Sequence, residues 1–406
     1  MSSHPVGYLS LLRTNTPFRR LWYGQIVSQL GDWFDSIALY ALLPRLTGSE
    51  QSVGLLLLAQ FIPTAIAGPL AGVIVDRLPR KLAMIGSDIG RALLVLALLF
   101  IHDPSQVWMI YSIVVLKFTF SAFFDPARSA ILPALVKREE LVAANTISSA
   151  TWSAMLAVGA ALGGVVAGVF GTDVAFAIDA ASFALSAVLI ASVRVRETHM
   201  DTPTQTNHLQ DLRAGVAYLA HDRDALVLTI CKALWSLGGG ILVVLTIFGR
   251  GVFPMGEGGA LSIGLLYAAR GVGAGIGPVI IGALGDQSER FMRRMMGLCF
   301  LISALGYALL PAAPVLALAA LAVMLAHCGG GTQWVYGTAL LQLRLPDAIQ
   351  GRIFAIELAL LTLTSGVSSY GTSLLADMGW SPASLSLLMA ALFALPGLWL
   401  WRRLGR

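Results

Sequence analysis

The chain carries little charge for its length. Asp, Glu, Lys and Arg together make up 12% of its 406 residues, whereas hydrophobic residues make up 57%, and the mean hydropathy is +0.78. A soluble globular domain carries about 25% charged residues. The shortage of charge therefore excludes an ordinary soluble domain and indicates a chain that lies in a bilayer.

The sequence also lacks the residue patterns that most reactive sites require. Its three cysteines, Cys231, Cys299 and Cys328, lie in apolar runs without metal-ligand or disulfide spacing, so we expect them to pack in the interior. The six histidines are scattered, and there is no Ser-His-Asp arrangement and no glycine-rich phosphate loop that ends in Lys-Ser or Lys-Thr. We therefore expect a protein that is not an enzyme, with no catalytic residues, cofactor or metal. The basic residues are spread over loops, so the net charge of +5 does not indicate nucleic acid as a partner.

Long apolar runs are abundant. A membrane-spanning helix needs about 20 apolar residues, and we place twelve such helices at 20–43, 52–75, 82–101, 106–124, 146–170, 174–193, 225–248, 259–284, 295–311, 314–341, 353–376 and 381–401. These predict an all-α membrane protein with two six-helix bundles, residues 1–193 and 223–406, joined by a cytoplasmic linker at 194–222. Apolar positions 209, 212, 216 and 219 recur at helical spacing in the linker, which predicts an interfacial helix or a solvated linker helix.

The basic residues fall mainly on one side of these spans. Of the 27 Lys and Arg residues, 21 lie on the side of the N-terminus, and four lie within spans. Only Arg45 and Arg250 lie on the opposite side. Because cytoplasmic loops carry an excess of Lys and Arg, we expect a multi-pass protein of a bacterial-type inner membrane, with both termini cytoplasmic.

One polar turn between apolar runs occurs twice. The segment GVIVDRLPRK at 72–81 has a weaker counterpart in GALGDQSER at 282–290, and both its glycine and its aspartate recur 210 residues later. Gly68-Pro69 likewise recurs as Gly277-Pro278. The two halves are therefore predicted to be copies of one unit. An even number of spans in each copy makes this a parallel repeat, related by an axis along the membrane normal.

The pattern Gly-Xaa-Xaa-Xaa-Asp-Arg-Xaa-Xaa-Arg-Lys of this turn resembles the signature loop of the major facilitator superfamily. Residues 18–34, 124–133 and 345–354 are similar to its branch of enterobactin exporters and macrolide efflux proteins, and that branch also resembles the lysophospholipid flippases. The resemblance implies the major facilitator fold, alternating access and a gating loop. The loop residues are Gly72, Asp76, Arg77, Arg80, Lys81, Gly282, Asp286 and Arg290. Charge that only sets topology is the alternative interpretation of this loop.

Two departures from that family are visible. The helix 5 motif Gly-Pro-Xaa-Xaa-Gly-Gly of exporters is present as Gly159-Ala-Ala-Leu-Gly163-Gly164, with alanine in place of proline. The arginine that many drug/proton antiporters carry in helix 4 is absent, and the nearest basic residue is Lys117. Proton coupling by the route of those antiporters is therefore not implied here.

Ionisable residues inside spans are costly and indicate function. Asp32 lies near the midplane of the first span, and Asp35 shares its helical face. We interpret this pair, with Arg91 of the third span facing it, as the site of proton coupling. The alternative is that Asp32 pairs with a basic residue only to fix the helix, and that Arg91 pairs locally with Asp88.

Other polar and aromatic residues inside the spans are candidates for the wall of a central cavity, although residues of this kind more often serve packing. They are Gln25, Gln60, Tyr111, Asp179, His327, Gln333, Trp334 and Glu357. Lys117, Lys232 and Arg270 are possible partners of the acids.

These residues predict a secondary active transporter that exports a hydrophobic or amphipathic small molecule, a drug or a siderophore, by proton antiport. The alternative is a lysophospholipid flippase, which needs no proton site but requires a lateral opening. The expected partners are a small-molecule or lipid substrate, protons and membrane lipids. The expected oligomeric state is a monomer.

Overall fold

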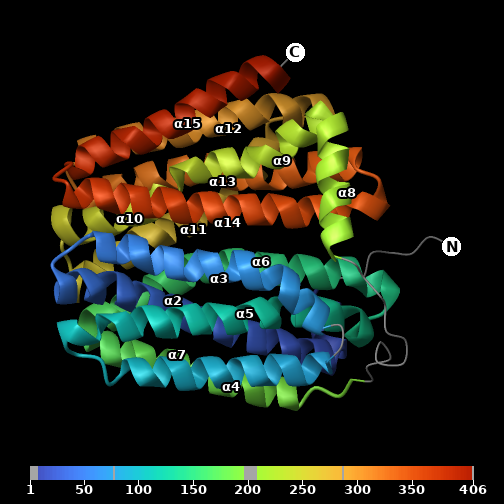
Figure 1. Ribbon diagram of the computed structural model, residues 1–406, viewed down its shortest axis with the longest axis horizontal. Helices are drawn as coiled ribbons and strands as arrows, with labels where there is room; N and C mark the ends of the chain where they lie inside the picture. Colours follow the sequence, from blue (N-terminus) through green and yellow to red (C-terminus); the bar gives the residue numbers. More distant parts are fainter. Residues whose placement is uncertain (1–7, 76–77, 196–207, 286–287, 405–406) are drawn as a thin grey trace.

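The computed structural model describes residues 8–75, 78–195, 208–285 and 288–404. Its N-terminal half consists of helices that run back and forth along one axis, drawn in blue to green in Figure 1. These helices are α1 (Tyr8–Thr14), α2 (Thr16–Thr47), α3 (Gln51–Val75), α4 (Arg80–Leu98), α5 (Val107–Leu135), α6 (Leu141–Val165) and α7 (Thr172–Ala191).

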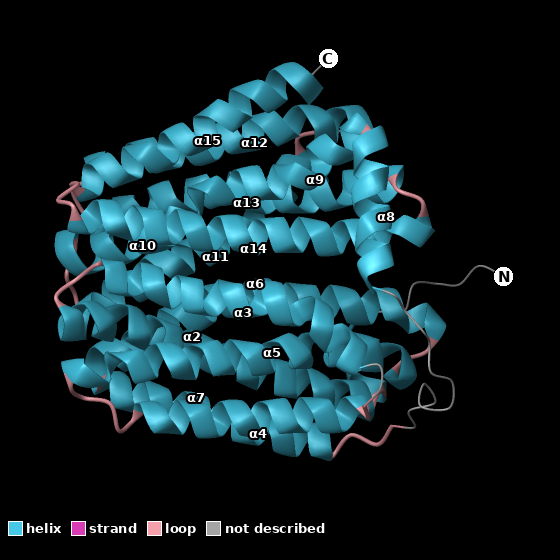
Figure 2. Ribbon diagram, in the orientation of Figure 1, coloured by secondary structure: helices cyan, strands magenta, loops and turns pink. Residues whose placement is uncertain are grey.

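The C-terminal half lies beside the first and is drawn in yellow-green to red (Figure 1). Its helices are α9 (Arg223–Ser236), α10 (Ile241–Ile247), α11 (Ala260–Ala283), α12 (Glu289–Leu309), α13 (Leu316–Arg344), α14 (Asp347–Asp377) and α15 (Pro382–Leu404). Helix α8 (His208–His221) crosses one end of this half transversely to the long helices, where the sequence predicts a linker helix (Figure 1). Figure 2 shows how short the loops between the long helices are.

Nine helical segments of the described residues are long and apolar enough to cross a membrane. The other three predicted spans correspond to α2, α3 and α4. Helices α2 and α4 contain the buried ionisable residues Asp35, Asp88 and Arg91, which lower their apolar content. The exposed surface of the bundle includes Phe100 and Val279, more than 70% exposed, as expected of side chains that face lipid.

Local sequence explains where α2 begins and ends. Asn15 is its N-cap, and the Asn15 side chain accepts a hydrogen bond of 2.9 Å from the backbone N–H of Phe18. At the other end Gly48 adopts φ 68° and donates its N–H to the carbonyl of Pro44, a left-handed cap that glycine adopts without strain. The helix is therefore longer than the predicted span 20–43 at both ends.

The predicted seventh span, 225–248, is not one continuous α-helix. Helix α9 gives way to a 3₁₀ turn at Leu237–Gly240, and α10 is followed by a π-helical segment at Phe248–Val252. Three successive glycines weaken the helix in the 3₁₀ turn. They also allow close approach, because a Cβ at Gly239 would lie 2.9 Å from the backbone of Ser365 on α14.

The two halves meet along two pairs of helices, α6 with α11 and α3 with α14. A Cβ on Gly264 of α11 would lie 2.6 Å from the carbonyl oxygen of Ala160 on α6. A Cβ on Gly271 would lie 2.6 Å from the backbone nitrogen of Ala157. Small residues of this kind let helix backbones pack closely within a membrane.

Ion pairs join the halves at one end of the bundle, which we call the closed end. Arg45 of α2 pairs with Glu257, and Arg250 pairs with Glu50 in the turn before α3. The carboxylate of Asp377, at the end of α14, accepts a hydrogen bond of 2.7 Å from the backbone N–H of Glu50. These contacts therefore connect the two halves through charged groups as well as through packing.

The halves separate toward the opposite end, which carries α8 and the turn between α13 and α14 and which we call the open end. Gly264, Gly271 and Gly275 share one face of α11, but a Cβ on Gly275 would meet nothing within 4 Å. A separate apolar cluster fills the N-terminal half there, with Phe18 and Ile131 among its buried members, and it includes no residue of the C-terminal half. The main core, by contrast, runs through both halves.

This geometry predicts different effects on stability for two substitutions on the same face of α11. Gly264→Leu forces α11 away from α6 and is expected to lower the free energy of unfolding by about 1–3 kcal/mol, the usual cost of overpacking. Gly275→Leu enters open space and is expected to leave thermal stability unchanged. Thermal unfolding of both purified variants in detergent tests this difference, and equal stability of the two would contradict the described seam.

Candidate functional site

The ammonium group of Lys117 lies among three carboxylates inside the N-terminal half. Its Nζ is 2.7 Å from Asp35, 2.9 Å from Asp32 and 3.3 Å from Asp179. The side chains of Lys117, Asp35 and Asp179 are at most 3% exposed, whereas that of Asp32 is 35% exposed. The structure thus brings two predicted coupling residues and one predicted cavity residue around a single cation.

Close helix packing positions these groups. Lys117 is on α5, Asp32 and Asp35 are on α2, and Asp179 is on α7. A side chain at Gly31 would collide with Ser182 and with the carboxylate of Asp179. The glycine that precedes Asp32 therefore allows α7 to approach α2 closely enough to bring the three acids together.

Arg91 of α4 extends the same group. Its guanidinium pairs with Asp88 one turn earlier and lies 4.0 Å from a carboxylate oxygen of Asp32. The rings of Phe124 and Phe183 flank it, with centroids 4.6 and 4.2 Å from the guanidinium carbon. Both interpretations made from the sequence therefore describe real contacts, because Arg91 pairs locally with Asp88 and also faces Asp32.

The charges of this group do not balance. Four carboxylates, Asp32, Asp35, Asp88 and Asp179, surround two cations, so full ionisation leaves two excess negative charges. Unbalanced charge away from water is costly. The oxygens of Asp32, Asp35 and Asp179 lie within 4.8 Å of one another, a spacing that suits a metal ion, but the Lys117 ammonium already occupies their midst. We call these four acids with Lys117 and Arg91 the acidic centre.

The C-terminal half contains a balanced charge pair. Lys232 of α9 donates to Glu357 of α14 at 2.8 Å and to the Thr338 hydroxyl at 2.9 Å. Its ammonium also lies 4.4 Å from the ring centroid of Trp334, which is 46% exposed. Gln333 is buried beside Trp334 on α13, and its side-chain nitrogen has no hydrogen-bond partner among the described residues.

In the described part of the chain, none of the remaining predicted cavity residues hydrogen-bonds to the charged groups of these two sites. Gln25 is buried and hydrogen-bonds to the Ser148 carbonyl at 3.0 Å. Tyr111 donates to the Ser52 carbonyl at 3.2 Å. His327 lies 2.9 Å from the Tyr307 hydroxyl inside the C-terminal half. Gln60 is buried on α3. Gln25, Tyr111 and His327 thus all have partners within their own half.

The predicted gating loop is described in part. Arg80 donates to the Ala130 carbonyl at 2.8 Å, and Lys81 donates to the carbonyls of Ala191 and Val193 at 2.7 and 2.8 Å. Gly72 lies in the last turn of α3. Gly282 is buried in α11, and Arg290 is exposed in the first turn of α12. Asp76, Arg77 and Asp286 lie outside the described residues.

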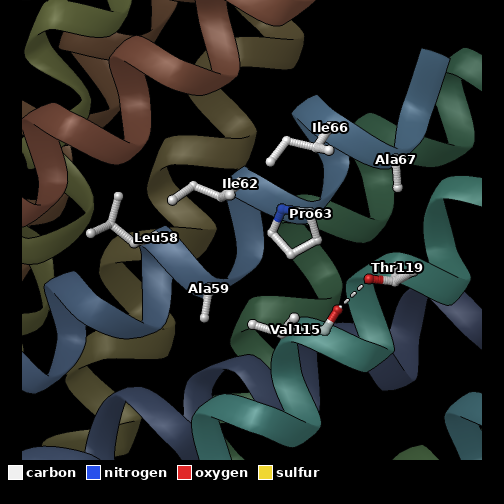
Figure 3. A pocket seen from close by; sticks show the side chains of 8 residues that line it. All are labelled: Leu58, Ala59, Ile62, Pro63, Ile66, Ala67, Val115 and Thr119. Atoms are coloured by element: carbon white, nitrogen blue, oxygen red, sulfur yellow. Dashed lines mark hydrogen bonds between the residues drawn. The ribbon is translucent and has the colours of Figure 1, made fainter. Parts of the chain in front are cut away.

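An apolar groove of about 300 Å³ lies on the surface between α3 and α5. Figure 3 shows its walls, which are formed by Leu58, Ala59, Ile62, Pro63, Ile66 and Ala67 of α3 and by Val115 and Thr119 of α5. The single hydroxyl, on Thr119, donates to the carbonyl of Val115. The groove therefore offers a bound molecule almost no polar contact, and none of the predicted cavity residues lines it.

Comparison with known proteins identifies the family. The family model described as Major Facilitator Superfamily matches residues 21–356. The chain belongs to the Major Facilitator Superfamily. It is a multi-pass membrane protein with the fold of these transporters, and the expected fold class is confirmed.

Relatives of this superfamily member include proteins named for efflux or export. Macrolide efflux protein A of Streptococcus pyogenes is 26% identical over 375 residues, which is 89% of each chain. The putative bacilysin exporter BacE of Bacillus subtilis is 24% identical over 364 residues, which is 88% of each chain. The predicted resemblance to the efflux branch is therefore confirmed.

A solved structure agrees with the fold. A bacterial homologue of the human lysosomal transporter Spinster, in an inward-facing and unoccupied conformation, has a TM-score of 0.75 to this chain. The identity is 14%, and the match covers 97% of this chain and 98% of the other. The likeness concerns the arrangement of the helices alone.

Lys117 is the residue of this major facilitator protein whose importance the sequence reasoning missed. From the sequence, Lys117 is only one of several possible partners of the acids, because no motif of the family marks it. The available signal was its position as a lone lysine in the long apolar run 106–124. Inside a membrane such a charge requires a counter-charge, and this half of the chain contains several buried acids.

Removing the central cation has a pH-dependent consequence. Lys117→Met leaves three neighbouring carboxylates without their shared cation, and we expect the free energy of unfolding at pH 8 to fall by about 3–5 kcal/mol, as when a buried ion pair is broken. Acid supplies protons that neutralise these carboxylates. The melting temperature of the variant should therefore approach that of the unmodified protein as pH falls from about 8 to 5.5.

Two controls accompany this measurement in detergent. Lys232→Met leaves one carboxylate, Glu357, without its cation, and its melting temperature is expected to depend less on pH than that of Lys117→Met. Asp35→Asn combined with Lys117→Met removes one of the stranded charges and should recover part of the stability at pH 8. A Lys117→Met protein that melts in parallel with the unmodified protein at every pH would show that the acidic centre does not hold excess charge.

Proposed function

We propose that this major facilitator transporter exports a hydrophobic or amphipathic small molecule, a drug or a siderophore, in exchange for protons by alternating access. The observation that carries this proposal is the acidic centre, in which four carboxylates surround two cations. Excess negative charge in a poorly hydrated interior favours the binding of protons, and a conformational change that alters its hydration allows their release.

Within the acidic centre Asp32 is suited to exchange protons with water. Its side chain is 35% exposed, whereas those of its neighbours Asp35 and Asp179 are almost fully buried. Protonation of Asp32 removes one negative charge from around Lys117. The cation then interacts with fewer ionised carboxylates, so the strength with which α5 is held to α2 depends on the protonation of this one residue.

The positions of charge support an inward-open orientation. Arg45 and Arg250, the two basic residues of the side poor in Lys and Arg, both lie at the closed end. The positive-inside rule assigns this end to the outside and the open end to the cytoplasm. A transporter in this state receives its substrate from the cytoplasm, which fits an exporter.

The two ion pairs at the closed end have the form of an outer gate. Arg45 pairs with Glu257, and Arg250 pairs with Glu50, so each half contributes one arginine and one glutamate. Both pairs must separate before the outer end can open. The relatives named as a macrolide efflux protein and a putative bacilysin exporter support the drug class of substrate.

Asp32→Asn is expected to abolish substrate-driven proton flux, because the amide cannot take up a proton. The measurement is proton flux in liposomes that contain the purified protein, with a macrolide, a catecholate siderophore or a lysophospholipid added. The matched control is Asp125→Asn, since Asp125 is an acid of the same half whose side chain is 72% exposed. Flux that survives in Asp32→Asn would remove this residue from the coupling site.

The outer gate can be tested by reversing and restoring one pair. Glu50→Arg places two arginines together and is expected to increase the opening of the closed end, whereas Glu50→Arg with Arg250→Glu restores the pair. The readout is the labelling rate of Gln60→Cys by a membrane-impermeant maleimide from the outside, with the three native cysteines replaced by alanine. The single variant should label several-fold faster, and the double variant should return to the starting rate.

A control for this gate experiment is Asp173→Arg, which makes the same change of charge at the start of α7, where the residue is exposed. It should not alter the labelling rate. Failure of Arg250→Glu to reverse the effect of Glu50→Arg would mean that the pair does not hold the outer end closed.

The apolar groove favours a second candidate function. Its walls between α3 and α5 suit an acyl chain and offer little to a polar solute. A lysophospholipid flippase would use such a surface for lateral access, and it requires no proton site. Movement of lysophospholipid without proton flux, in the same liposome experiment, would replace the exporter by this alternative.

A further inference from the structure

Four basic residues lie within the predicted spans, and one of them differs from the others. Arg91, Lys117 and Lys232 each pair with at least one carboxylate. Arg270 of α11 has no carboxylate within 4.0 Å and no hydrogen bond to any residue that the structure describes, and its Nε atom is buried without a partner. An arginine remains charged at every physiological pH. Its charge inside the membrane therefore calls for an anion from elsewhere.

Arg270 lies at the boundary between the halves. Gly271, the next residue, packs against the backbone of α6, and Gly273 packs against the backbone of Met324 on α13. One turn earlier, Tyr267 stacks on Tyr40 of α2 with 5.4 Å between ring centroids. The guanidinium carbon of Arg270 is 5.9 Å from the centroid of the Tyr267 ring. The charge thus lies beside helices of both halves.

The charges of the two halves are of opposite sign. When fully ionised, the acidic centre has two excess negative charges, and its carboxylate at Asp32 is partly exposed. In the C-terminal half Lys232 and Glu357 compensate one another, which leaves the positive charge of Arg270. A solute between the halves therefore meets a negative group on the α2 side and a positive group on the α11 side.

We propose that Arg270 binds the oxyanion, a carboxylate or a phosphate, of a zwitterionic amphipathic substrate whose amine faces the acidic centre. The proposal rests on the proposed function, because it assumes that a solute binds between the halves. A guanidinium presents two parallel N–H donors to a carboxylate or phosphate. The apolar part of the molecule would contact the aromatic rings beside Arg270.

The test measures binding to the purified full-length protein in detergent with three probes. They are the dipeptide phenylalanylphenylalanine, its C-terminal amide and lysophosphatidylethanolamine. The dipeptide and its amide differ only in the oxyanion. We expect the unmodified protein to bind the dipeptide at least tenfold more tightly than the amide. Arg270→Gln should remove this preference by weakening the dipeptide alone, and Arg270→Lys should retain part of it.

The lipid probe separates the two sources of an oxyanion. Weaker binding of lysophosphatidylethanolamine to Arg270→Gln, with no effect on the dipeptide, would assign the subsite to a lipid phosphate. The control is Arg402→Gln, which removes an exposed arginine at the end of α15 and should change none of the three affinities. Equal binding of the dipeptide and the amide, together with unchanged lipid binding in Arg270→Gln, would overturn the proposal, as would binding of none of the probes.

A second readout needs no ligand. If Arg270 awaits an anion that the chain does not supply, Arg270→Met removes an uncompensated charge and should raise or preserve the melting temperature of the empty protein. A lower melting temperature, like that expected for Lys117→Met, would mean that Arg270 has a structural partner, and it would overturn the proposal. Neither readout depends on a proton gradient. Loss of the antiport mechanism would therefore leave the anion subsite standing, and loss of the subsite would leave the antiport mechanism standing.

Discussion

The N-terminal half depends on the attraction between one buried ammonium group and the carboxylates around it. Lys117 connects α5 to α2 and α7 through Asp32, Asp35 and Asp179. In the low-dielectric interior such attractions are far stronger than at a protein surface. The same environment makes the surplus carboxylates costly. The cluster therefore holds three helices together, and in the proposed antiport a single added proton would weaken that attraction.

The seam between the halves follows a different principle. Glycines on α11 bring its backbone against α6 near the closed end. Two ion pairs at that end, Arg45 with Glu257 and Arg250 with Glu50, also join the halves. Packing of this kind is either made or lost, since a backbone that moves away by a few ångströms loses its contacts together. At Gly275 the contact is already lost. The seam therefore tapers along the bundle, and a rocking motion of the halves needs no change inside either of them.

The sequence was sufficient for the fold but not for the site. The thickness of a bilayer sets apolar runs of about 20 residues, which are visible in a single sequence. The repeated turn at 72–81 and 282–290 is visible there in the same way and indicates two copies of one unit. The break of the seventh span at Leu237–Gly240 depends on contacts with α14, which the local pattern does not contain. Helix packing likewise decides that three carboxylates surround Lys117 and that no described carboxylate lies within 4.0 Å of Arg270. Asp32 and Asp35 were identifiable because two acids within one span are rare in themselves.

The paired contacts at the closed end also bear on the origin of the chain. Arg45 and Arg250 occupy matching ends of their halves, as do Glu50 and Glu257, and each arginine meets the glutamate of the other half. This is the reciprocal arrangement that a twofold axis imposes on two identical subunits. A protein of half the length that forms a twofold-symmetric dimer needs only one arginine and one nearby glutamate to make both ion pairs, because each residue is present once in each subunit. In a chain made of two such copies the inner surfaces can differ, with acids in one half and, in the other, Arg270, which pairs with no carboxylate of the described residues, while the outer contact keeps its symmetry.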